Sequence, residues 1–239
     1  PQRPKPTMSK VKFSFPFFIY VLWIFVNTSC NNSRNHSARD IASSPKELQQ
    51  KASTHIADLI KFAKDNGGKI DDSTELKYFK PLISVYEECK HKTVWSMGEE
   101  WLPIGDSMYH FIANAKLYGL FPQDYHFTQL SSIYNRIFND SNSNSDRKDA
   151  TLWAKADLML TDAFFHIVKD VKLGRLPQDS ITLRKDSALT DVFYVHQFDT
   201  LMKTGALTAT IHKLEPKIAA YDLLKQGIKK FLENYDDKV

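Results

Sequence analysis

The strongest constraint on the fold is a long helical pattern in residues 149–173. Apolar side chains recur there at spacings of three and four, which is the repeat of one face of an α-helix. They are Leu152, Ala156, Met159, Leu160, Ala163, Phe164, Ile167 and Val171. Gly174 follows the last turn, at a place where glycine commonly ends a helix. Convincing two-residue alternation is absent from the chain, so the predicted fold class is mainly α.

Other segments repeat this spacing. Helices are predicted at residues 45–66, 76–89, 105–118, 124–137, 192–203 and 219–235. Ser44 is the expected N-cap of the first helix, and Asp124 is the expected cap of the fourth. Pro81 lies inside the second pattern, so that helix either begins there or bends. Residues 139–148 are predicted to be a solvated loop, and residues 176–191 to be irregular.

The N-terminal region has the parts of an export signal. Lys10 and Lys12 precede an apolar block at residues 13–26, and Cys30 follows a short stretch of small and polar residues. A basic start, an apolar core and a cleavage region are typical of a secretory signal. The cysteine at the junction favours a bacterial lipoprotein signal, cleaved before Cys30 with lipid added to its sulfur. Met8 is the expected translation start.

Two alternatives stay open for this segment. A membrane-spanning helix needs about 20 apolar residues, whereas this block is shorter and contains Pro16. An ordinary secretory signal would be cut near Ser29 without lipid, and Asn27 stands where lipoprotein signals usually carry leucine. The lipoprotein interpretation places the protein on the periplasmic side of the bacterial envelope, and the second alternative secretes it to the periplasm without lipid.

Composition divides the chain into three regions. Residues 1–29 are the export region, residues 30–44 are a tether rich in Asn, Ser and Arg, and residues 45–239 are a multi-helix domain. Four of the 32 basic residues and none of the 28 acidic residues lie in residues 1–29, so the remainder has equal numbers of each. Without a basic stripe in that remainder, nucleic-acid binding is not expected.

Three groups of polar residues were candidates for chemistry. Asp162 and His166 lie one helical turn apart, but Asp157 is well round the helix, so they are expected to flank a buried face. Cys89 continues an apolar stripe and is expected to be a buried structural thiol rather than a nucleophile activated by His91. Tyr125 and His126 form a turn and helix start. No catalytic site, metal site or cofactor is predicted from the residues.

Several blocks nevertheless resemble one family in the same order. Residues 117–126 (LYGLFPQDYH) are similar to its "GL-x-P-x-x-YH" turn, and residues 157–175 are similar to its "D-x-x-L-T-D-A-F" helix ending in "D-x-x-x-G-R". Tyr86 and Trp95 fit its upstream pattern, and residues 214–224 fit its "L-x-P-x-x-x-x-Y-x-x-L" segment. The motif positions are Gly119, Pro122, Tyr125, His126, Asp157, Thr161, Asp162, Gly174, Arg175, Pro216 and Tyr221.

Over roughly residues 75–232, the chain thus resembles the α-helical scaffold domain of large bacterial murein L,D-transpeptidases. The resemblance implies that the complete enzyme cross-links and remodels peptidoglycan. A cysteine thiolate would attack the bond after the third-position diamino acid of a donor stem peptide, and an acceptor amine would resolve the thioester. That cysteine belongs to a separate catalytic domain, and neither Cys30 nor Cys89 occupies its motif. We expect the chain to be inactive alone.

Two versions of this function follow from the resemblance. In the first, the chain is the scaffold portion of a longer reading frame, with peptidoglycan as the partner of the complete enzyme and a membrane as the partner of the lipid anchor. In the second, it is a stand-alone envelope lipoprotein that binds peptidoglycan or a protein without catalysis. A hydrolase using Asp162 and His166 is a third hypothesis. The oligomeric state is left open.

A structural expectation accompanies the resemblance. Asp162 and Tyr125 should be at least partly buried and should join helices through hydrogen bonds, because a buried carboxylate needs partners to offset its desolvation.

The lipoprotein hypothesis makes a direct prediction about Cys30. Mass spectrometry of the exported protein should find Cys30 as the N-terminal residue with acyl chains on it, and Cys30→Ser should release the protein from the membrane fraction. A mature protein that begins elsewhere, or an unmodified Cys30, would contradict the hypothesis.

Overall fold

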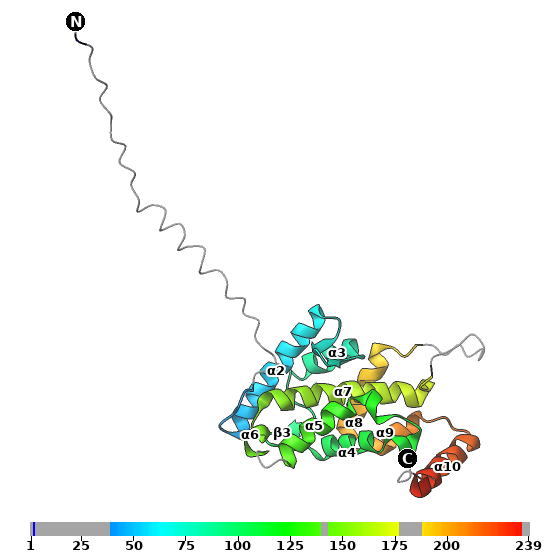
Figure 1. Ribbon diagram of the computed structural model, residues 1–239. Coiled ribbons are helices and arrows are strands. Elements are labelled where there is room, and N and C mark those ends of the chain that lie inside the picture. Colours follow the sequence, from blue (N-terminus) through cyan, green and yellow to red (C-terminus); the bar gives the residue numbers. More distant parts are fainter. Residues whose placement is uncertain (1, 3–38, 140–142, 177–187, 236–239) are drawn as a thin grey trace. The chain divides into compact units, whose positions relative to one another are not determined.

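The computed structural model describes residue 2 and residues 39–139, 143–176 and 188–235 (Figure 1). The chain divides into two compact units, residues 1–35 and 36–239, and every described residue except Gln2 belongs to the second. The export signal, Cys30 and most of the predicted tether lie outside the described residues. Helices predominate in the second unit, which confirms the mainly α class. Within the described ranges, no helix has both the length and the apolar character needed to cross a bilayer.

Helix α7 (Ala150–Leu173) is the centre of the second unit. Its neighbours are the 3-10 turn η2 (Pro122–Tyr125) and the helices α2 (Pro45–Asp65), α3 (Phe79–Glu88), α4 (Pro103–Ala113), α5 (Phe127–Phe138), α8 (Asp191–Thr204) and α9 (Leu207–Leu214) (Figure 1). Asp149 caps its start by accepting a hydrogen bond from the Thr151 amide, and Gly174 (φ 88°) follows its end. The predicted helix is therefore confirmed. It is buried around nearly its whole circumference rather than on one face, as expected for a helix surrounded by others.

Helix α2 (Pro45–Asp65) packs along α7. The Ser44 hydroxyl accepts a hydrogen bond from the Glu47 amide, which confirms the predicted cap. Two glycines of positive φ, Gly67 and Gly68, then lead into a hairpin of β1 (Lys69–Asp71) and β2 (Thr74–Glu75). A Cβ on Gly68 would lie 2.7 Å from the backbone oxygen of Leu76, so only glycine fits there.

Helix α3 (Phe79–Glu88) begins two residues before Pro81, so the proline lies in its first turn and causes no bend. A second hairpin, β3 (Ser96–Met97) and β4 (Glu100–Trp101), separates α3 from α4 (Pro103–Ala113). The 3-10 turn η1 (Ala115–Tyr118) follows and ends at Gly119 (φ 70°), the predicted stop.

The predicted role of Asp124 is wrong. Asp124 lies inside η2, and α5 (Phe127–Phe138) begins after His126, whose φ of 59° is left-handed. The Asp124 carboxylate instead accepts from Arg175, with 2.7 Å between Oδ2 and Nε. A sequence pattern favoured Asp124 because Asp is a common cap, but the turn that precedes α5 displaces the helix start by three residues.

The predicted loop at residues 139–148 is also corrected. Residues 143–147 form a short helix, α6 (Ser143–Arg147), and Asp146 within it is buried. Its carboxylate is paired with Arg39 and with Arg136, whose Nε lies 2.9 Å from Oδ2. Charged partners from two other segments thus organise a stretch whose polar composition is typical of a loop.

The described residues from 188 to 235 form three helices, one of which was not predicted. Helices α8 (Asp191–Thr204) and α10 (Ala219–Tyr235) agree with prediction, while α9 (Leu207–Leu214) was missed. A helix of α9's length offers only two turns of periodicity. Most of the stretch predicted to be irregular, residues 177–187, lies outside the described residues.

Residues 39–44 are bound to the start of α7, although the tether was predicted to extend to residue 44. Ala42 donates a backbone hydrogen bond to Lys148 (2.8 Å), and Ala150 donates one to Asp40 (2.9 Å). The Asp40 amide also donates to the Asp149 carboxylate at 3.1 Å. The folded body therefore begins before α2.

The contact of α4 with the β3 strand region gives a stability prediction. A Cβ at Gly105 would lie 2.3 Å from the Trp95 backbone oxygen, so Gly105→Ala should lower the free energy of unfolding by about 2–3 kcal/mol through overpacking. Gly227→Ala is the matched control, because nothing lies within 4 Å of its Cβ position, and it should be neutral or stabilising. Urea unfolding of both variants measures the difference. Equal stabilities would contradict the close contact.

Candidate functional site

The motif residues on α7 belong to a row of polar side chains inside the core. Asp157 and Asp162 are each 1% exposed and Thr161 is fully buried. The expectation from helix spacing that Asp157 and Asp162 flank a buried face is therefore wrong, whereas His166, the third residue of that group, is half-buried. Asp157, Thr161 and Asp162 are tolerated in the interior because each finds hydrogen-bond partners on a neighbouring segment.

Asp157 binds the chain that follows α3. Its carboxylate accepts hydrogen bonds from the amides of Val94 and Trp95, both at 3.0 Å, and from the Tyr86 hydroxyl at 2.6 Å. Thr161, one turn further along, accepts from the Trp95 indole at 2.8 Å and lies 2.9 Å from the Tyr86 hydroxyl. One face of α7 thus fixes both ends of the turn between α3 and β3.

Asp162 binds two other segments. The Tyr78 amide donates to its Oδ1 at 2.6 Å, and His126 Nε2 lies 2.8 Å from its Oδ2. Tyr78 precedes α3 and His126 precedes α5, so one carboxylate joins three helices. Tyr125 is fully buried, and its hydroxyl donates to Asp170 at 2.8 Å. The expected burial and hydrogen bonding of Asp162 and Tyr125 are confirmed.

Burial shifts the pKa values of this network. It raises the pKa of Asp157 to about 6, against three hydrogen bonds that lower it. It also raises the pKa of the Tyr86 and Tyr125 hydroxyls, so both stay protonated as donors. Burial lowers the pKa of His166, which stacks edge-on against Tyr125 with 5.0 Å between ring centroids.

Two further motif residues, Pro122 and Arg175, lie at the turn that carries Tyr125 and His126. Pro122 is buried and begins η2, and Arg175 lies over the ring of Phe121 (4.2 Å) while pairing with Asp124. Arg175, which follows α7, thereby binds the turn that carries Tyr125 and His126. Gly119 and Gly174 both have positive φ, at the ends of η1 and α7.

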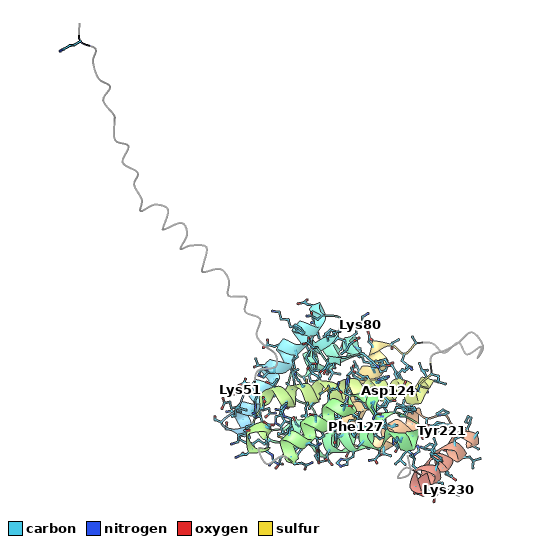
Figure 2. The ribbon with its side chains drawn as sticks, in the orientation of Figure 1. Lys51, Lys80, Asp124, Phe127, Tyr221 and Lys230 are labelled. Carbon is cyan, nitrogen blue, oxygen red and sulfur yellow. The ribbon has the colours of Figure 1, made fainter. Side chains whose placement is uncertain are left out.

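Pro216 and Tyr221 do not join the network. Pro216 is half-buried between α9 and α10. Tyr221, labelled in Figure 2, is half-buried in the first turns of α10, and the Lys225 ammonium lies 5.7 Å from the centre of its ring. Burial raises the pKa of Tyr221 to about 12.

Sequence reasoning missed Tyr78, and it included Asp170 only as the first residue of the "D-x-x-x-G-R" block without singling it out as a member of the network. A signal for Asp170 was present, because Asp162, His166 and Asp170 recur every four residues within an apolar helix. No pattern pointed to Tyr78, since its contribution is a backbone amide.

The network shows no catalytic arrangement. Its carboxylates are occupied by internal donors, and Cys89 is half-buried with a pKa raised by burial, which disfavours the reactive thiolate. Cys89 was expected to be a buried structural thiol; it is the C-cap of α3 and packs against the core, but only half-buried. Among the described residues, no three His, Cys, Asp or Glu side chains are grouped as a metal site.

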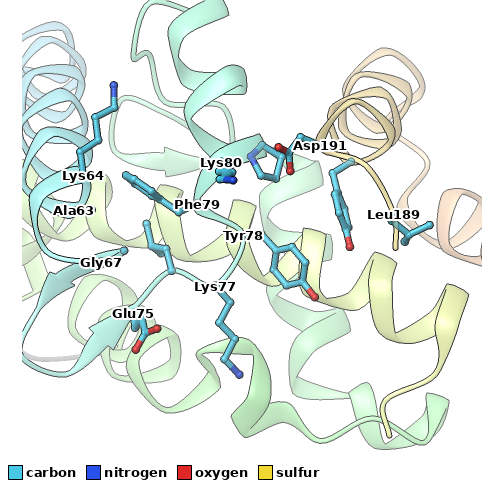
Figure 3. Close-up of a pocket in the computed structure, with 14 residues that line it drawn as sticks. Ala63, Lys64, Gly67, Glu75, Lys77, Tyr78, Phe79, Lys80, Leu189 and Asp191 are labelled. Carbon is cyan, nitrogen blue, oxygen red and sulfur yellow. The ribbon is translucent and has the colours of Figure 1, made fainter. Parts of the chain in front are cut away.

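A surface groove adjoins the network at Tyr78. Its cavity volume is about 490 Å³, and it runs between the end of α2 and the start of α8, over residues 75–81 (Figure 3). Lys64, Lys77 and Lys80 line it together with Glu75 and Asp191. Tyr78 lies at the floor of the groove. Its ring centroid is 5.5 Å from that of His166 and 5.1 Å from that of Tyr194.

Comparison with known families gives one match. The model of a family described as "Scaffold domain" matches residues 80–228, which include α3 through most of α10. Neither the curated proteins nor the solved structures gave a significant match.

The burial of Asp157 predicts a pH dependence of stability. Its pKa of about 6 in the folded chain exceeds the ordinary 3.8, so the folded state binds this proton more tightly. The resulting stabilisation is complete below about pH 4 and is lost as pH rises through about 6, a change of about 3 kcal/mol. Urea unfolding from pH 4 to pH 7 should show this decline in the wild type but not in Asp157→Asn.

The comparison between the two proteins isolates Asp157 from other titrating groups. If their free energies of unfolding change in parallel with pH, the carboxylate is ionised throughout and the prediction is wrong.

Proposed function

Because the chain belongs to the scaffold-domain family, whose model spans more than half of its length, we propose that it is the non-catalytic scaffold portion of a lipid-anchored L,D-transpeptidase that cross-links and remodels peptidoglycan. The proposal rests mainly on the finding that residues of the resembling motifs are the same residues that form the hydrogen bonds of α7. The positions that resemble those enzymes, above all Asp157, Thr161, Asp162 and Tyr125, are the ones that fasten α7 to its surroundings.

A scaffold of this kind contributes by positioning. Three loops that enter from different parts of the chain are bound to one helix by short hydrogen bonds, so their relative positions are fixed. Holding a substrate-binding and a catalytic module in a set orientation can supply several kcal/mol of a reaction barrier. The acyl transfer itself would be carried out by a cysteine outside residues 1–239, as the resemblance implies.

Helix α10 provides the surface on which such a module would dock. Leu223, Leu224 and Phe231 are 67%, 66% and 58% exposed on it, and contiguous exposed apolar surface of this kind marks interaction sites. The helix is held to the domain mainly through η1 and through the Lys225–Glu215 ion pair (2.6 Å). Its apolar side faces outward, where an apolar surface of a catalytic or substrate-binding module would cover it.

The alternative function is a stand-alone envelope lipoprotein that binds peptidoglycan or a protein partner. The groove beside Tyr78 favours this version, because it is a binding surface that requires no second module. A pull-down with purified sacculi separates the two versions when combined with the nucleotide sequence that follows the codon for Val239. A cysteine-containing catalytic domain encoded there supports the first version, and a stop codon with sacculus binding supports the second.

The docking surface can be tested in the complete reading frame, expressed in its native envelope. Leu224→Glu with Phe231→Glu should lower the fraction of L,D-cross-linked muropeptides several-fold, because a charge on each apolar contact prevents docking. Val192→Glu is the control, since Val192 is an apolar side chain that is 77% exposed on α8. It should leave cross-linking unchanged.

Thermal unfolding of the purified chain should be the same for all these variants, because the substituted side chains are exposed. Unchanged cross-linking in the α10 double variant would contradict the proposed docking surface.

A further inference from the structure

The groove beside Tyr78 has a rigid floor and charged walls. Its floor is the segment before α3, which is fixed by the 2.6 Å hydrogen bond from the Tyr78 amide to Asp162. Its first wall is the turn at Gly67 and Gly68, closed by the hydrogen bond from the Leu76 amide to the Gly68 oxygen (2.9 Å). A volume of about 490 Å³ is within the range of small-ligand sites.

The lysines of the groove are available to a ligand. Neither the Lys77 nor the Lys80 ammonium has an ion pair or hydrogen bond with any residue in the described ranges. Both residues line the groove, and Figure 3 shows the Lys77 side chain extending away from Phe79 and Lys80. Lys64 pairs with Glu87 at 3.3 Å, but these side chains are 47% and 58% exposed. An exposed pair of this kind contributes little and exchanges readily.

Two acidic residues also line the groove. Glu75 comes from β2 and Asp191 from the first turn of α8, and both are exposed. Among the described residues, neither carboxylate has an ion pair. The groove is therefore lined by three lysines and two acidic residues together with aromatic side chains. A purely anionic ligand would place its charge next to Glu75 and Asp191, and a purely cationic ligand would place its charge next to the lysines.

We propose that this groove binds a short acidic peptide that also carries a free amine, namely a peptidoglycan stem peptide ending in a diamino acid. The carboxylates of the peptide pair with Lys77, Lys80 and Lys64, and its ammonium group pairs with Glu75 or Asp191. Its methylene chain packs on the rings of Tyr78 and Phe79. The choice of a stem peptide rests on the proposed function, whereas the charge pattern of the ligand follows from the groove.

Isothermal titration of the purified full chain with a synthetic acidic tripeptide ending in a diamino dicarboxylic acid tests the proposal. We expect saturable binding that weakens with salt. Lys77→Glu with Lys80→Glu should reduce the affinity about tenfold or more, because two charge-assisted contacts are lost.

The matched control is Lys61→Glu with Lys172→Glu. Both control lysines are exposed on α2 and α7 but do not line the groove, and the change in net charge is the same. This variant should bind within about twofold of the wild type. Thermal unfolding of both double variants should match the wild type, which excludes loss of folding as the cause.

A second probe, the same peptide with its side-chain amine acetylated, tests the role of Glu75 and Asp191 and should bind several-fold more weakly. Absence of saturable binding by the wild type, equal loss in both double variants, or equal binding of the acetylated probe would each overturn the proposal. This test does not depend on the α10 experiment. If the chain binds the peptide but no catalytic domain is encoded downstream, only the proposed enzyme role is refuted. If cross-linking depends on α10 but the chain does not bind the peptide, only the inference about the groove is refuted.

Discussion

The hydrogen bonds that Asp157 accepts from two successive backbone amides determine much of the remaining structure. A carboxylate inside the core is stable only when donors replace its lost water, and Val94, Trp95 and Tyr86 supply them. Those donors can meet only if α3 ends where it does and the chain turns back toward α7. The indole of Trp95 is then placed against Phe198 of α8, with 5.7 Å between the ring centroids.

Asp162 and Asp170 repeat this arrangement along α7. Asp162 binds the Tyr78 amide and the His126 ring nitrogen, and Asp170 accepts from the Tyr125 phenol, so two segments from other parts of the chain are bound. Apolar packing alone would allow neighbouring helices to slide, because it has little directional preference. Directional hydrogen bonds at intervals along one helix define the register of its neighbours, which is the property that a positioning domain requires.

The sequence predicted the long helices well, because three- and four-residue spacing directly reports a buried face. It predicted α2 almost to the residue, including the Ser44 cap. Apolar periodicity alone failed for Asp157 and Asp162, since it assigns a charged residue to the surface unless its partners are known. The burial of Asp162 was expected only when the resemblance was considered as well. The partners of both residues lie 36 to 84 residues away in the chain. The groove was unpredictable for the same reason, because its walls come from α2, β2 and α8.

The attachment of residues 39–44 to the start of α7 has a mechanical consequence. A chain fastened upstream to a membrane would transmit any tension through Arg39 and Asp40, and that tension would first meet the bonds to Asp146, Asp149 and Ala150. The load would therefore enter the domain at the capped end of its central helix instead of unwinding α2 from its N-terminus.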